Sequence, residues 1–296
     1  MSAGLRGSRQ QSATSPTRPA RPTRPARRTR AARPSGRSGS RRPVAAELEA
    51  VYVYGIVGAG VPVPDELPGV GDAPVRVVAD GSVAALTSTL PSRALGTAAD
   101  LRAHARVIET IHRSCAVLPM RFGAALENTH AVVAELLEPH ADDFAGALQR
   151  VGDHDQFVLR GRYLQGAAFA EVLAEDPQVA RMSAWLRERD PDTHRLEAIK
   201  LGALVARVLE RKQRADIEFM TEFLEPRVTA IAERVPATPE IAVDAAFLVP
   251  RPDRPSFEQA AEELGRRWAN RIRLRLVGPL PVYDFAQTPE MDQWAC

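Results

Sequence analysis

The chain has 296 residues, of which 45% are apolar and 26% charged, a composition typical of a globular protein with about two domains. Its two cysteines, Cys115 and Cys296, exclude a disulfide framework and a four-cysteine zinc site and indicate a reducing compartment. No run of apolar residues approaches the roughly 18 needed to cross a bilayer, and the first residues lack the apolar stretch of a secretory signal. We therefore expect a cytoplasmic protein with no membrane partner.

The positive charge is concentrated at the N-terminus. Residues 1–46 contain 12 arginines and no acid, whereas the whole chain has a formal net charge of only +2, so the rest of the chain is acidic. This segment repeats Arg-Pro pairs and has almost no side chain that could build a core, and we predict that it is disordered. It would attract nucleic acid non-specifically through counterion release, although a dispensable solvated extension explains the same composition.

The first predicted elements are β-strands. The run of apolar, β-prone residues at 51–57 predicts a buried strand. Two further strands at 75–78 and 83–87 are joined across Asp80-Gly81, which favours an antiparallel hairpin.

A helix follows, and Thr97 and Asp100 form a capping box at its start. A short strand at 116–118 and a longer helix at 129–150 complete a first α+β domain, which we place at 47–153. The first helix is expected to bury one apolar stripe, formed by Leu101, Ala105, Ile108 and Ile111.

The second half is rich in predicted helix. After a strand at 157–159, helical periodicity runs from 167 to 234, with interruptions at Asp176-Pro177, Asp190-Pro191 and Glu225-Pro226. The last predicted elements are a strand over 241–249, a helix over 256–269 and a strand over 271–277.

This order of elements predicts an α+β fold with two domains. Each domain would be an open, mainly antiparallel sheet with helices on one face. We place the second, helix-rich domain at 154–278 and an extended, hydrogen-bond-poor tail at 279–296.

Signals for catalysis or cofactor binding are weak. Gly58 and Gly60 follow a strand, as in a dinucleotide-binding fingerprint, but Val63 stands where the third glycine is needed. None of the six histidines pairs with another at helical spacing, so we expect surface or helix-face histidines and no metal site. Cys115 lies at a predicted helix C-terminus, which raises a thiol pKa, and we interpret it as a small core residue. We predict no cofactor and no enzymatic activity, and keep a catalytic site in the cleft between the domains as a less favoured hypothesis.

Three arginines alternate with aliphatic residues near the end of the second domain. Arg271, Arg273 and Arg275 would share one face of a strand. Such a row suits an acidic partner or a phosphate backbone, or it is only the solvated face of a half-buried strand. The strand lacks the aromatic residues with which RNA-binding sheets stack bases, which disfavours nucleic-acid binding by the folded part.

Three segments carry a family resemblance. They are VYVYGIV at 51–57, VLPMRFG at 117–123 and GPLPVYDF at 278–285. Their order and spacing resemble the GvpF/GvpL family of gas vesicle proteins over about residues 50–285. The family pattern has two adjacent prolines in the third segment, where this chain has Val282 at the second position, and the arginine-rich extension is not typical of it.

This resemblance implies an accessory or minor structural protein of gas vesicle formation. It implies a location in the cytoplasm and at the vesicle, work with the hydrophobic shell protein GvpA and with other gas vesicle proteins, and domains related to the ferredoxin-like fold. Because a shell subunit with a large apolar surface aggregates in water, an assembly factor has to offer matching apolar surface. A nucleic-acid-binding protein acting through residues 1–46 is the alternative function.

The second and third segments supply candidate partner-binding residues. Arg121 and Phe122 lie in a turn after Pro119, and the structural alternative is that Phe122 fills the first core while Arg121 pairs with an acid. Tyr283 and Phe285 either pack back onto the first domain or contact a partner. The full set predicted for partner binding is Arg121, Phe122, Tyr283, Phe285, Arg271, Arg273 and Arg275.

Overall fold

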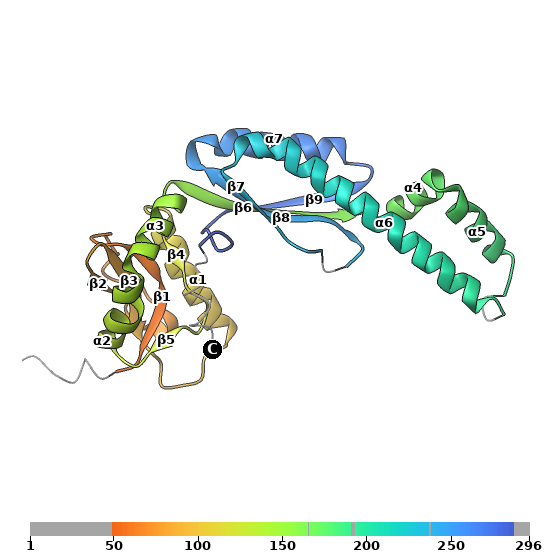
Figure 1. Ribbon diagram of the computed structural model, residues 1–296. Coiled ribbons are helices and arrows are strands. Elements are labelled where there is room, and N and C mark those ends of the chain that lie inside the picture. The colour runs from red at the N-terminus through yellow and green to blue at the C-terminus, as the bar shows by residue number, and fades with distance from the viewer. Residues whose placement is uncertain (1–48, 165, 191–192, 237, 287–296) are drawn as a thin grey trace, which may run out of the picture. The chain divides into compact units, whose positions relative to one another are not determined.

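The computed structural model describes residues 49–286, with gaps at 165, 191–192 and 237. The predicted disorder of residues 1–46 and the predictions for residues 287–296 lie outside the described residues. The described residues belong to one compact unit that contains two antiparallel β-sheets (Figure 1).

The first sheet has five strands with β1 (Val51–Gly58) at its centre. The strand order is β2-β3-β1-β4, and β5 pairs with the start of β1. The predicted hairpin is confirmed, because β2 and β3 pair antiparallel around Gly81, which has a φ of 54° that glycine adopts without strain. The other strands are β2 (Arg76–Asp80), β3 (Val83–Thr89), β4 (Leu118–Pro119) and β5 (Ala125–Leu126).

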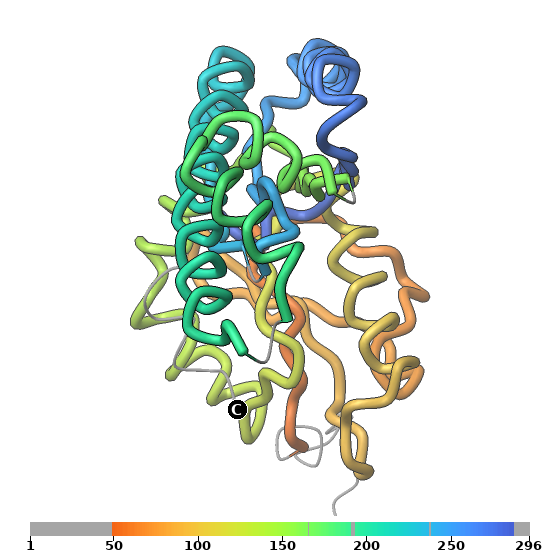
Figure 2. The backbone as a smooth tube through the Cα atoms, turned by 90° about the vertical axis from the view of Figure 1, so that its right-hand side faces the viewer, coloured from red at the N-terminus to blue at the C-terminus, as the bar shows by residue number. Residues whose placement is uncertain are grey.

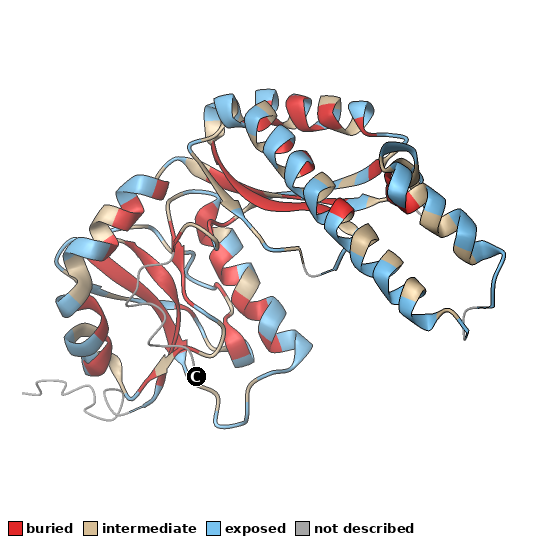
Figure 3. Cartoon of the chain, turned by 45° about the vertical axis from the view of Figure 1, so that its right-hand side comes forward, coloured by how far each residue is buried: buried red, intermediate tan, exposed pale blue. Residues whose placement is uncertain are grey.

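Helices cover both faces of this sheet, so the predicted arrangement with helices on one face is wrong here (Figure 3). On one side α1 (Ala98–His112) packs over Tyr52 and Tyr54, and on the other α3 (Ala141–Val151) packs near Val53. The physical reason is that β1 is apolar at nearly every position, so either face would lose burial if it faced water.

The helices on the first sheet lie close to the predicted residue ranges, but their buried faces and their continuity differ from the prediction. The capping box of α1 is confirmed, whereas Leu101 of the expected stripe is 50% exposed, because the buried side is centred on Val107 and Ile108. The helix predicted at 129–150 is interrupted near Pro139, which cannot donate a helical hydrogen bond. Its parts are α2 (Thr129–Ala131), a π-helical turn (Val132–Leu137), a 3-10 turn (Glu138–His140) and α3.

The second sheet has the order β7-β8-β6-β9, with every pairing antiparallel. Helices α6 and α7 cover one of its faces around Phe157 and Phe247 (Figure 1). The predicted extension of the helix to residue 234 is wrong, because Pro226 ends it in a 3-10 turn (Glu225–Arg227) and the apolar residues beyond pair with β8. The strands are β6 (His154–Tyr163), β7 (Ala230–Glu233), β8 (Ile241–Pro250) and β9 (Ile272–Leu280).

Two further helices lie beside the N-terminal half of α6. Helices α4 and α5 pack on α6 through a small core of Val172, Val179 and Val208 (Figure 2). The predicted break at Asp176-Pro177 is confirmed, and the Asp176 carboxylate caps α5 by accepting two backbone N–H bonds. The helices are α4 (Ala167–Glu175), α5 (Pro177–Arg187), α6 (Arg195–Leu224) and α7 (Arg254–Arg267), with 3-10 turns at Val70–Asp72 and Arg251–Asp253.

The predicted α+β fold class is therefore confirmed, with two antiparallel sheets and attached helices. Strand β9 continues to Leu280, past the predicted boundary at 278, and residues 281–286 form a turn rather than an extended tail. In this turn the Ala286 N–H donates to the Val282 carbonyl oxygen at 2.9 Å, and both side chains are buried. The domain boundary that we propose, at 153/154, lies between the two sheets. None of the described helices is long and apolar enough to cross a membrane.

Candidate functional site

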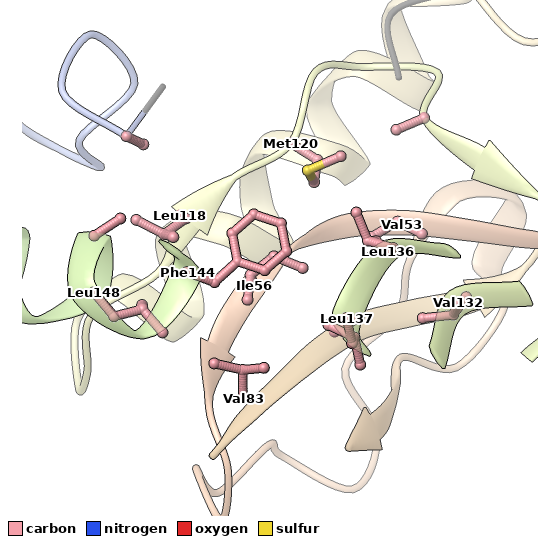
Figure 4. Packing of buried hydrophobic residues seen from close by; sticks show 14 of the residues in the cluster. Val53, Ile56, Val83, Leu118, Met120, Val132, Leu136, Leu137, Phe144 and Leu148 are labelled. Atoms are coloured by element: carbon pink, nitrogen blue, oxygen red, sulfur yellow. The ribbon is translucent and has the colours of Figure 1, made fainter. Parts of the chain in front are cut away.

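The three sequence segments meet around one hydrophobic core. Val53 comes from the first segment, Leu118 and Met120 from the second and Val282 from the third, and all four are at most 2% exposed. Figure 4 shows Val53, Leu118 and Met120 packed around Phe144 of α3. The segments are therefore spatial neighbours, although they lie far apart in the sequence.

Backbone hydrogen bonds join the first two segments. The Met120 N–H donates to the Tyr54 carbonyl and the Val53 N–H donates to the Ala124 carbonyl, each at 2.9 Å. The Gly123 N–H donates to the Tyr52 hydroxyl at 3.1 Å, and Gly123 has a φ of 95°, which a side chain would disfavour. These bonds fix the turn that carries two of the predicted contact residues.

A buried histidine lies beneath this turn. His104 of α1 is 6% exposed, and its Nδ1 is 2.9 Å from the Tyr52 hydroxyl. Burial lowers the pKa of His104 to about 4, against a weaker opposing effect of its hydrogen bond with the Met120 backbone. Burial also raises the pKa of Tyr52 to about 12. The expectation of surface or helix-face histidines holds for His104, which lies on the buried face of α1. Its position one turn before Ile108 is the sequence signal that could have located it in the core.

The third segment is tied to the second sheet through Asp284. The Arg234 guanidinium donates to both carboxylate oxygens of Asp284, with Nη2 at 2.9 and 2.7 Å. Gln156 of β6 donates its amide N–H to Asp284 and accepts the Asp284 backbone N–H at 2.8 Å. Phe285 packs against the first core beside the buried Val282. The segment thus connects β6 to the core beneath the first sheet.

The predicted contact residues of these segments differ in exposure. Phe122 is half-buried against Tyr52 and His104, with ring centroids 6.2 and 5.7 Å apart, and Phe285 is also half-buried. Arg121 is exposed, and Tyr283 is 37% exposed. Arg121 and Tyr283 are therefore accessible to a partner, whereas the two phenylalanines contribute mainly to packing.

The predicted arginine row is divided. Arg271 donates to both oxygens of Asp216, at 2.5 and 2.7 Å, and to Glu171 at 2.7 Å. Tyr163 donates its hydroxyl to the same Asp216 at 2.5 Å, and burial raises its pKa strongly. These bonds hold α4 and α6 against the second sheet. Arg273 and Arg275 are instead exposed on β9, so the structure does not gather the three arginines into one surface.

A second surface is apolar, and the sequence did not single it out. Helix α6 presents Leu196, Ile199, Ala206 and Leu209 at helical spacing, which we call the α6 stripe. Leu196 and Ile199 are 69% and 60% exposed. The C-terminal end of the stripe opens into a cavity of about 380 Å³, lined by Val205, Leu209 and Pro239 among others.

A larger hollow of about 710 Å³ adjoins this cavity. It shares Leu209 and Pro239 with the first cavity and adds the 42% exposed Phe169 of α4. The sequence could have indicated this apolar surface, because α6 has more apolar positions than its packing against α4, α5 and the sheet can bury.

The described residues offer few groups suited to metal binding or to nucleophilic chemistry. Among the described residues, no group of three or more His, Cys, Asp or Glu side chains is placed to hold a metal ion. Cys115 is half-buried against the core over α1, and burial raises its thiol pKa, which opposes nucleophilic chemistry. The chemically distinctive features are an apolar stripe and exposed arginines.

Comparisons with known proteins agree with the family resemblance that the three segments carry. The family model described as gas vesicle synthesis protein GvpL/GvpF matches residues 50–287. Gas vesicle protein F of Streptomyces sp. strain CB03234 is 29% identical over 241 residues, which cover 80% of this chain and all of that protein. Gas vesicle protein L of the same strain is also 29% identical, over 81% of this chain and 94% of its own.

Solved structures share the fold. The crystal structure of GvpF from Anabaena sp. PCC7120 aligns with a TM-score of 0.71 at 23% identity, covering 81% of this chain and 99% of that one. GvpF from Microcystis aeruginosa aligns with a TM-score of 0.67 at 22% identity, with the same coverage. The three segments, which form one core, lie within the matched range, and the chain belongs to the GvpL/GvpF family of gas vesicle synthesis proteins.

Proposed function

We propose that this protein assists the assembly of the gas vesicle wall by binding the hydrophobic shell protein GvpA, at the growing vesicle in the cytoplasm. Membership of a gas vesicle synthesis family supports the process, and the α6 stripe supports the mode of binding. The role is one of binding rather than catalysis. Other gas vesicle proteins are further candidate partners.

The α6 stripe is the observation that carries this proposal. Five of the large hydrophobic residues that are exposed lie on α4, α5 and α6, namely Phe169, Trp185, Leu196, Ile199 and Phe219. Exposed apolar surface continuous with a cavity is typical of a partner-binding site. An apolar helix or strand of GvpA would gain burial along the stripe and reach the cavity at its end.

The gain in free energy follows from the exposed area. Full burial of an aliphatic side chain contributes about 1.5–3 kcal/mol, and Leu196 and Ile199 are each more than half exposed. Covering both would contribute about 2 kcal/mol, or roughly thirtyfold in the dissociation constant. Arg121 and Tyr283 are proposed as additional contacts near the third segment.

Affinity capture of GvpA tests the proposal. The tagged chain is co-expressed with GvpA as wild type and as the double variant Leu196→Ser/Ile199→Ser, and captured GvpA is quantified. We expect the double variant to retain only a small fraction of the GvpA that the wild type retains. The matched control is Leu101→Ser/Val77→Ser, which removes two hydrophobic residues of 50% and 40% exposure from α1 and β2. Equal capture by wild type and double variant would contradict the proposal, and so would equal loss in the control.

A further inference from the structure

The edge strand β9 of the second sheet exposes the face that α6 and α7 do not cover. Helices α6 and α7 (Figure 1) pack on the side of Phe157 and Phe247. The register of β6 and β9 places arginines on the opposite side. Their register places Arg160 opposite Arg275 and Arg162 opposite Arg273. We call these four residues the arginine face.

Carboxylates neutralise only half of this face. Asp244 accepts from Arg160 at 2.8 Å, and Glu240 pairs with Arg162. Arg273 and Arg275 are exposed, and neither has an ion pair or hydrogen bond among the residues that the structure describes. The face therefore keeps an excess of positive charge at the edge strand β9, in a folded part of the chain that is acidic overall.

The pairing of like charges has a physical cost. Like charges directly opposite each other on neighbouring strands destabilise a sheet, and this sheet has two such pairs in consecutive rows. A bound group with two carboxylates would remove the repulsion and add two ion pairs. The unbound face is thus less stable than the same face with an acidic occupant.

The adjoining row of the sheet is apolar. Val158 pairs with Val277, which is 37% exposed and lies two residues beyond Arg275 on the same face. An occupant lying along β9 would therefore meet an apolar side chain next to two arginines. This pattern matches a polypeptide that alternates an apolar residue with carboxylates. A nucleic acid fits less well, because none of the paired residues on this face is aromatic and could stack a base.

We propose that the arginine face binds an acidic segment of a partner protein, whose carboxylates pair with Arg273 and Arg275 and whose apolar side chain covers Val277. Charge complementarity excludes residues 1–46 of this chain as the occupant, because they contain 12 arginines and no acid. Arg162 and Arg273 also line the larger hollow that adjoins the α6 stripe, but this proposal rests on the charges of β6 and β9 and does not depend on binding of GvpA.

Photo-crosslinking tests the proposal in the full chain. The probe is a short peptide of alternating valine and glutamate with a central photoreactive residue, and crosslinked positions are mapped by mass spectrometry. We expect crosslinks on β6 and β9 that fall about tenfold in the variant Arg273→Glu/Arg275→Glu, since two ion pairs are lost. Crosslinks to the arginine-rich residues 1–46 serve as an internal reference, because they should be equal in every variant.

Three controls separate this site from general attraction between opposite charges. The variant Arg102→Glu/Arg106→Glu makes the same change of charge on the exposed side of α1 and should keep the β6 and β9 crosslinks. A peptide with glutamine in place of glutamate should lose them. A chain ending at Ala286 should crosslink as the wild type does.

Four results would overturn the proposal. The first is crosslinking confined to residues 1–46, and the second is a yield on β6 and β9 that the charge reversal leaves unchanged. The third is displacement of the peptide by an equal concentration of single-stranded DNA, which would assign the face to nucleic acid. The fourth is a tenfold gain in the chain ending at Ala286, which would assign it to residues 287–296.

Discussion

Stability at mildly acidic pH should depend on His104, which joins α1 to the first two sequence segments. In the folded chain its imidazole is 6% exposed and its pKa is lowered to about 4, mainly by burial. In the unfolded chain the pKa returns to about 6.5. Between these values the unfolded chain binds a proton that the folded chain does not bind, so the free energy of unfolding falls as the pH falls.

The size of the effect follows from the two pKa values. Between pH 7 and pH 5 this one residue should lower the free energy of unfolding by about 2 kcal/mol. His112 has a pKa lowered by burial as well and adds to the loss in the same direction. Carboxylates with lowered pKa values, such as Glu171, take up protons only at more acidic pH. The comparison of pH 7 with pH 5 therefore reports on the histidines rather than on these carboxylates.

Urea unfolding at pH 7 and pH 5 measures this loss. The variant His104→Gln can keep a hydrogen bond with Tyr52 but has no proton to gain. Its free energy of unfolding should therefore change by about 2 kcal/mol less between the two pH values than that of the wild type. An equal change in both proteins would refute the assignment to His104, and so would a wild-type stability that is independent of pH over this range.

Three further substitutions test the contacts around the segments. Tyr52→Phe should lower the free energy of unfolding by about 1–3 kcal/mol in urea, because a buried hydroxyl that serves two partners is lost. Asp284→Ala should lower it by about 1–2 kcal/mol, because Arg234 loses its bidentate partner in a partly exposed site, and Asp284→Asn should lose less. Arg275→Glu should instead raise the melting temperature, with a gain of about 0.2–1 kcal/mol, because a repulsive pair with Arg160 becomes attractive, and a lower melting temperature would contradict the register.

Much of the first sheet and of its helices could be predicted because the signals for them are local. The Asp80-Gly81 turn and the capping box of Thr97 depend on neighbouring residues only, and both are confirmed. The strand at 51–57 was also identified from its continuous apolar run. The same run indicated burial on both faces, but it could not show which elements cover each face, because α1 and α3 are distant in the sequence.

The elements and roles that were missed depend on contacts between distant residues. Strand β7 is only four residues long and is defined by its pairing with β8. Its sequence does not differ enough from the preceding helix to mark a change of structure, so the predicted helix ran across it. Arg271 matched the exposed pattern of Arg273 but is held by Asp216, 55 positions earlier. Similarly, the exposure of Leu196 on α6 depends on which helices pack beside it.

The most direct test of the proposed function is vesicle formation in cells. The gene for this protein is deleted from a host that forms gas vesicles and is replaced by wild type, Leu196→Ser/Ile199→Ser or Leu101→Ser/Val77→Ser, and intact vesicles are measured as pressure-sensitive turbidity. We expect wild type and the Leu101/Val77 control to restore the turbidity and the α6 variant, at equal protein level, to fail. Normal vesicles after the deletion, or full restoration by the α6 variant, would contradict a role in assembly through the α6 stripe.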